Sequence, residues 1–213
     1  MVTFTAGAIG ANFDQIDIGA LAAGAPLGAT ATAFGLALGS ELDQFSGAGF
    51  AFGANGLPTA GTITDIQETL GGQPSFTIGG LNLPVTDLLS WIATDASEGA
   101  KAAIFAGADI INGPDANDLL RGYSGDDTIT GLGGSNYLRG DEGDDLITGG
   151  SGFDDINGNM GNDTLHGGAG DDWVVGGKDN DLVFGDDGDD IVLGNLGNDT
   201  LDGGNGADVV RGG

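Results

Sequence analysis

The sequence predicts an all-β protein whose second half is a solenoid of stacked short repeats. Three observations predict this fold. A nine-residue unit recurs without insertion through residues 107–213. Glycine supplies 45 of the 213 residues, about three times its usual share, which favours a chain with many turns. In the first half, apolar and polar residues alternate with a period of two over short segments, as in half-buried strands.

A change in composition near Gly107 divides the chain into two regions, 1–106 and 107–213. The first has nine acidic residues and one basic residue, and it is rich in Ala, Gly, Thr and Phe. The second has the other 23 acidic residues and four basic ones. We therefore expect a β-rich N-terminal domain followed by a domain of twelve repeats.

Strand signals run through the first region. Residues 30–34 alternate with a period of two, and residues 75–78 form another strand candidate. Residues 48–52 lead through a turn signal to residues 61–66, a pattern typical of a hairpin with a longer loop. From Pro84 the apolar spacing becomes that of a helix face, so one or two short helices are predicted near residues 84–106.

We expect neither a cleaved signal peptide nor a transmembrane segment. Residues 1–5 contain no basic stretch and no continuous apolar stretch of the kind that a signal peptide needs. The apolar residues 16–38 are interrupted by Asp17, Pro26 and repeated Gly and Thr, which argues against a membrane span.

The repeat unit of the second region is G-x-D-x-U-x-G-x-x, in which U is aliphatic. The D position is Asp in eleven of the twelve units, and the glycine four residues later is present in every unit. The glycine two residues before D is replaced only at Ala116 and Asp179, and Asp179 should need an unusual backbone conformation. The D positions are Asp109, Asp118, Asp127, Asn136, Asp145, Asp154, Asp163, Asp172, Asp181, Asp190, Asp199 and Asp208.

This pattern predicts a divalent cation between the repeats. U should point into a thin core, glycine should supply the turn conformations, and alternate units should stack. Stacked strands lie about 4.8 Å apart, where two carboxylates repel by roughly 3–4 kcal/mol at an effective dielectric constant near 20. Carboxylate and carbonyl oxygens suit Ca²⁺, and same-edge neighbours allow up to about ten ions. Pairs that contain Asn136 should bind more weakly.

The second region resembles a known family. Residues 143–150 (GDDLITGG) and 161–168 (GNDTLHGG) are similar to the haemolysin-type, repeats-in-toxin (RTX) calcium-binding nonapeptide. The resemblance covers about half of the chain. It implies a right-handed parallel β-roll, a β-solenoid with two units in each coil and calcium between turns on the same edge. It also implies type I export from a Gram-negative bacterium, with the chain unfolded inside the cell and folded outside.

Calcium should be required for folding of the repeats. One aliphatic residue in nine buries too little apolar surface to offset the conformational entropy that ordering costs. We therefore expect residues 107–213 to be disordered without Ca²⁺ and to fold when it binds, at the millimolar concentrations found outside cells.

The residues beside U should face solvent, mostly polar on one sheet and apolar on the other. The apolar group, accompanied by Arg121, Arg139 and Arg211, predicts a contact surface for self-association. The plainer explanation is that such residues simply suit strands. A twelfth unit that stops one residue short suggests an open coil end for head-to-tail stacking. The interface candidates are Trp173, Val175, Ile191, Leu193 and Val209.

Composition and motifs exclude several functions. A net charge of −27 opposes nucleic acid binding because carboxylates repel phosphate. The absence of Cys excludes disulfides and thiolate metal sites. The chain has no H-E-x-x-H or G-x-S-x-G motif, and its one histidine, His166, occupies an outward repeat position. We therefore expect that the chain is not an enzyme.

Three functional hypotheses remain. The first is a secreted structural protein that binds calcium and self-assembles into an extracellular filament, surface layer or matrix, with contact to a cell surface or matrix. The second is a monomeric secreted calcium-binding adhesin or effector module. The third is an ice-binding solenoid, suggested by outward threonines and weakened by Leu146, Leu182 and Phe184, which interrupt them.

Overall fold

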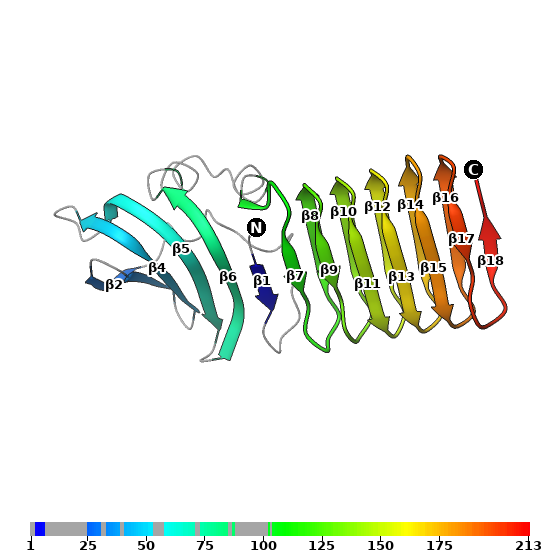
Figure 1. The fold of residues 1–213 in the computed structure, drawn as a ribbon. Coiled ribbons are helices and arrows are strands. Elements are labelled where there is room, and N and C mark those ends of the chain that lie inside the picture. Colours follow the sequence, from blue (N-terminus) through cyan, green and yellow to red (C-terminus); the bar gives the residue numbers. More distant parts are fainter. Residues whose placement is uncertain are drawn as a thin grey trace. The chain divides into compact units, whose positions relative to one another are not determined.

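The described structure is almost entirely β (Figure 1). A computed structural model describes residues 3–6, 25–30, 33–38, 41–52, 58–70, 73–84, 87, 102 and 104–213. The chain divides into two compact units, and the second includes Phe105–Gly213. Within the described ranges, no helix is long and apolar enough to cross a membrane.

The first unit is an antiparallel sheet in which the strands pair in the order β2, β3, β4, β5, β6, β1. Ile63, Ile66 and Leu81 are buried in it. Its strands are β1 (Thr3–Ala6), β2 (Ala25–Thr30), β3 (Ala33–Leu38), β4 (Glu41–Phe52), β5 (Pro58–Leu70) and β6 (Gln73–Pro84).

The sequence predictions for this region are confirmed in part. β4 and β5 form the predicted hairpin, and β6 contains the predicted strand at residues 75–78. A continuous strand over residues 30–34 is wrong, because β2 and β3 are antiparallel and Thr30 lies opposite Ala33. A run of alternating small residues does not reveal where the chain reverses. The predicted helices near residues 84–106 lie largely outside the described residues.

The second unit is a parallel β-roll, as predicted. Its odd-numbered strands form one parallel sheet and its even-numbered strands form the other, so the two sheets alternate along the chain (Figure 1). The strands are β7 (Ile110–Asn112), β8 (Leu119–Ser124), β9 (Thr128–Thr130), β10 (Tyr137–Glu142), β11 (Leu146–Ser151), β12 (Asp155–Met160), β13 (Thr164–Ala169), β14 (Trp173–Lys178), β15 (Leu182–Asp187), β16 (Ile191–Leu196), β17 (Thr200–Asp202) and β18 (Val209–Arg211).

Each residue of the roll pairs with the residue eighteen positions later, so one coil contains two nine-residue units. Leu138 lies opposite Ile156 in the even-strand sheet, and Ile147 lies opposite Leu165 in the odd-strand sheet. No register shift interrupts these parallel pairs. A repeat of constant length therefore brings equivalent residues of successive coils into straight columns.

The core of the roll is a double row of aliphatic side chains. The ten U positions from Ile111 to Val192 have no exposed surface. Leu201 is partly exposed and Val210 is 48% exposed in β17 and β18, the last strands of the described structure. At the other end, the buried Phe105 stacks on Tyr123 with ring centroids 6.2 Å apart. The prediction that U points inward is thus correct, and Val210, although exposed, lies in the same column opposite Val192.

Candidate metal sites

The D positions form two hydrogen-bonded ladders, one along each edge of the roll. On the first edge, the backbone N–H of each aspartate donates to Oδ1 of the aspartate one coil later, at 2.8–3.1 Å. This edge contains Asp109, Asp127, Asp145, Asp163, Asp181 and Asp199. The second edge repeats the arrangement at 2.8–3.0 Å. It contains Asp118, Asn136, Asp154, Asp172, Asp190 and Asp208.

These ladders use only one oxygen of each carboxylate. The other oxygen, Oδ2, is buried without a hydrogen-bond partner at seven D positions in the described structure. A buried carboxylate oxygen that has lost water and gained no partner is costly, so each position calls for a positive group. The seven are Asp127, Asp145, Asp154, Asp163, Asp172, Asp181 and Asp190.

At several of the glycines four residues after D, Oδ2 of an aspartate and a backbone carbonyl oxygen of the next coil lie so close that a Cβ atom would clash with both. At Gly167, a Cβ atom would lie 2.6 Å from Oδ2 of Asp172 and 2.6 Å from the carbonyl oxygen of Gly185 in the next coil. Calcium lies 2.3–2.6 Å from its oxygen ligands in proteins. These two oxygen atoms from neighbouring coils are therefore close enough together to ligate one Ca²⁺, and they are of the kind that this ion prefers. Gly122 and Gly140 have equivalent pairs of oxygen atoms on the first edge.

The close approach of these oxygen atoms explains why the residue four positions after D is always glycine. Its φ is not positive at any unit from Gly113 to Gly203, so its backbone conformation is open to other residues. The expectation that glycine is present for its turn conformation is therefore wrong at this position. The same expectation is correct for the glycine two residues before D, since Gly143 and Gly161 have φ values of 136° and 127°. Asp179, which replaces such a glycine, has the expected strained φ of 77°.

Each candidate site combines one aspartate with backbone carbonyl oxygens from stacked turns. Within the described structure, no group of three His, Cys, Asp or Glu side chains converges on one point. Backbone carbonyls must therefore complete the ligand set. A set made only of oxygen atoms is typical of hard cations, Ca²⁺ above all, and it supplies no redox chemistry. When bound, the ion would neutralise the buried carboxylates and link neighbouring coils.

Burial strongly perturbs the carboxyl groups of the ladders. Loss of solvent is the largest cause of the raised pKa values, and neighbouring carboxylates raise most of them further. The backbone N–H donor of each ladder acts in the opposite direction and lowers the pKa. The pKa is raised to about 7 at Asp127, Asp145, Asp163 and Asp172, to about 6 at Asp181, and also at Asp154 and Asp190.

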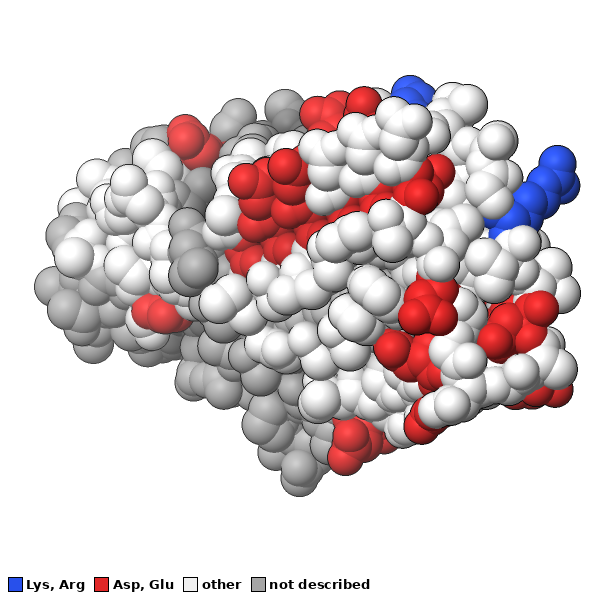
Figure 2. All heavy atoms as spheres, turned by 45° about the vertical axis from the view of Figure 1, so that its right-hand side comes forward, with Lys and Arg blue, Asp and Glu red and all other residues white. Residues whose placement is uncertain are grey.

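Acidic side chains dominate the surface that surrounds these sites. Figure 2 shows several patches of acidic side chains over the roll and few basic ones. On the first edge, a second ladder joins the residues that precede D, with backbone N–H groups donating to side-chain Oδ1 atoms at 2.7–3.2 Å. It consists of Asp126, Asp144, Asn162, Asn180 and Asn198. The sequence signal for it is an Asp or Asn at eighteen-residue spacing, which cannot be seen within a single nine-residue unit.

The structure brings the predicted interface residues together on the outer face of the even-strand sheet. Trp173 lies opposite Ile191, and Ile191 lies opposite Val209. Val175 lies opposite Leu193 in the neighbouring column. The side chains of Trp173, Ile191 and Val209 are 45%, 39% and 59% exposed. We call these five residues the contact face.

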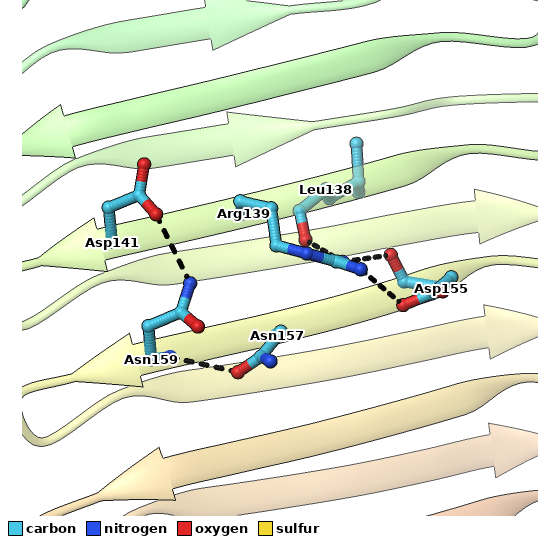
Figure 3. Close-up of polar contacts among 6 residues, drawn as sticks. All are labelled: Leu138, Arg139, Asp141, Asp155, Asn157 and Asn159. Carbon is cyan, nitrogen blue, oxygen red and sulfur yellow. Dashed lines mark hydrogen bonds and ion pairs between the residues drawn. The ribbon is translucent and has the colours of Figure 1, made fainter.

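Two of the three arginines expected beside the contact face are paired with acidic residues instead. Arg139 donates to the backbone oxygen and Oδ1 of Asp155 at 2.8 Å (Figure 3). Its guanidinium group also lies 3.4 Å from the ring centroid of Tyr137. Arg121 forms an ion pair with Asp141 at 2.9 Å. The contact face is therefore apolar, and these two arginines bind acidic residues of neighbouring strands in the even-strand sheet.

Stacked turns with unpartnered carboxylate oxygens beside backbone carbonyl oxygens define a calcium-binding parallel β-roll. The chain belongs to the RTX calcium-binding nonapeptide repeat family, whose family model spans four copies of the nonapeptide. The family matches residues 105–138, 121–156, 130–165, 148–183, 157–192, 166–201 and 184–213. No curated protein and no solved structure matches this chain significantly.

Displacing one pair of oxygen ligands should remove one ion. In Gly167→Ala the new methyl group would clash with Oδ2 of Asp172 and with the carbonyl oxygen of Gly185, so we expect one fewer Ca²⁺ per chain. Gly133→Ala is the matched control, because its Cβ would have only an ordinary contact, with Asp115 Oδ1 at 3.4 Å. Native mass spectrometry in calcium measures the number of bound ions. Equal counts in the two variants would contradict the assignment of these two oxygen atoms as ligands.

Acidification should weaken calcium binding. In the unfolded chain these aspartates ionise near pH 4, but in the folded roll the carboxyl of Asp145 ionises near pH 7. Because the folded-state pKa is raised, the ion-free roll becomes more stable as the pH falls from about 7 towards 4. Calcium must displace these protons, so at pH 6 the affinity should fall about tenfold for each carboxyl with a pKa near 7.

Calcium titrations at pH 7.5, 6.5 and 5.5, followed by circular dichroism, measure this dependence. The calcium concentration at the midpoint should rise at each step towards lower pH. A midpoint that is constant over this range would show that the carboxyls of the ladders do not take part in binding.

Proposed function

We propose that this protein is a secreted, calcium-binding structural protein that folds outside the cell and self-associates through its contact face. The product would be an extracellular filament, surface layer or matrix. The observation that carries the proposal is the alignment of large apolar side chains across three successive strands of one outer face. Calcium binding follows from the family, and self-association is our addition to it.

The apolar character of the contact face supports self-association. Its residues come from β14, β16 and β18, where the unbroken register places them in two adjoining columns. In the same columns one coil earlier, β12 presents Asp155 and Asn157, which are polar. Contiguous exposed apolar residues bordered by polar ones are typical of protein interaction sites. A second copy of the chain offers an identical patch, so a two-fold contact would cover both and form a dimer, and a filament or layer would join such dimers through a further contact.

Net charge links this contact to calcium. Two copies that each carry −27 repel one another strongly in the absence of a counter-ion. About ten bound ions would add about +20 and leave a small net charge on each copy. The same ions that align the coils would thus make close approach of two copies favourable. Self-association should accordingly follow calcium binding and not precede it.

An extracellular location agrees with the chemistry of the sites. Calcium modules that act outside cells bind the ion with affinities of about 10⁻⁴–10⁻³ M, so they are empty in the cytosol and filled after export. RTX repeats are typical of proteins exported by type I systems. We propose the same route here, with contact to a cell surface or matrix after folding.

Other functions have less support. We propose that the chain is not an enzyme: His166 pairs with Asp186 at 3.0 Å and stacks on Phe184 on an outer strand face. An ice-binding surface would need continuous rows of threonine. In the odd-strand sheet, Thr164 lies between Leu146 and Leu182 in one such column. A monomeric adhesin or effector module is the alternative that the experiment below distinguishes.

Replacing both Trp173 and Ile191 with Ser should abolish assembly, because it removes two large, exposed apolar side chains of the contact face. Leu146→Ser with Leu182→Ser is the control, since these residues are equally exposed, at 43% and 44%, on the odd-strand sheet. Negative-stain microscopy and light scattering with and without Ca²⁺ are the measurements. The wild type and the control should assemble only in calcium. A monodisperse wild type in calcium would favour the monomeric module.

A further inference from the structure

Asn136 is the one D position of the roll that is not acidic, and the structure keeps it within the ladder of the second edge. Its side chain is buried, with 3% exposure. Its Oδ1 accepts the backbone N–H of Asp118 at 3.0 Å, and its own N–H donates to Oδ1 of Asp154 at 2.9 Å. The amide thus occupies the same position as the carboxylates above and below it.

The ladder fixes which way this amide points. The backbone N–H of Asp118 is a donor and needs an acceptor, so it must face Oδ1 of Asn136. Turning the amide over would place two N–H donors against each other in a buried site, which costs the free energy of an unmade hydrogen bond. The Nδ2 group therefore has to take the position that Oδ2 takes at the other turns.

That Nδ2 group lies beside a backbone carbonyl oxygen of the next coil, as Oδ2 does at other turns. A Cβ atom on Gly131 would lie 2.5 Å from Nδ2 and 2.5 Å from the carbonyl oxygen of Gly149 in the next coil. Nδ2 has no partner at hydrogen-bonding distance in the described structure, although its interaction with the carboxyl of Asp154 lowers the pKa of that group. The carbonyl oxygen is present as at the other turns, and the atom that faces it is a donor instead of an acceptor.

We propose that the Asn136 turn excludes calcium and closes without it. Its N–H donors carry partial positive charge towards the position of the ion, so they repel a cation instead of ligating it. A neutral amide is also far less costly to bury than a carboxylate that lacks its ion. The turn that joins the coils of Asp118 and Asp154 is thus a neutral link, and the second edge holds one ion fewer than its geometry allows.

This inference rests on calcium binding by the repeats and not on self-association. It concerns a single residue, so changes at that residue test it directly. In Asn136→Asp the Oδ1 atom would keep the hydrogen bond from Asp118, and Oδ2 would replace Nδ2 beside Gly131 and the carbonyl oxygen of Gly149. We expect the full-length variant to bind one more Ca²⁺ than the wild type, and to be more stable to heat in saturating calcium.

Asn136→Ala tests the same proposal without adding a charge. It should bind the same number of ions as the wild type, although it loses the hydrogen bond to Asp118 and should be less stable. Asp154→Asn, on the same edge one coil later, is the matched control and should bind one ion fewer. Native mass spectrometry and equilibrium dialysis with ⁴⁵Ca²⁺ both give the ion count.

Two results would overturn the proposal. An unchanged count in Asn136→Asp would show that replacing the amide does not open a site, and a lower count in Asn136→Ala would show that Asn136 already ligates calcium. A wild type that binds no calcium at all would instead contradict the metal sites as a whole. Failure to assemble would leave these counts unaffected, so the two proposals can fail independently.

Discussion

The structure of the roll depends on the neutralisation of a column of buried carboxylates along each edge. One oxygen of each of these aspartates accepts a backbone N–H of the previous coil, and the other is buried without a hydrogen-bond partner. Without a cation, this arrangement brings like charges together in a place shielded from water, where repulsion is strong. We therefore expect the rest of the fold, with its thin core and short strands, to form only when that cost is removed.

The same constraint determines the geometry on which function depends. The ladders repeat from coil to coil, and the parallel pairs contain no register shift, so the register of neighbouring coils is fixed. As a result, side chains that are eighteen residues apart form straight columns on the outer faces, and Trp173, Ile191 and Val209 become one surface. The ions would therefore act twice, by ordering the roll and by lowering the charge that keeps two copies apart.

The sequence was sufficient to predict what depends on the period alone. A constant length of nine determines which residues share an edge, a core column or an outer face, and these predictions were correct for the roll. It was insufficient where the outcome depends on contacts between coils. The sequence could not reveal that a carboxylate oxygen and a carbonyl oxygen of the next coil approach the invariant glycine. It also could not reveal that Arg139 binds Asp155. Near Thr30, period-two alternation did not reveal that the chain reverses.

The central claim is that residues 105–213 have this fold only when cations occupy the two edges. Hydrogen–deuterium exchange of the full-length chain, resolved by peptide with mass spectrometry, tests it most directly. In calcium, backbone amides of the stacked strands β8 to β16 should be protected for hours. In EDTA at neutral pH the same amides should exchange at the rate of an unfolded chain. Protection of these strands that persists in EDTA would contradict the account.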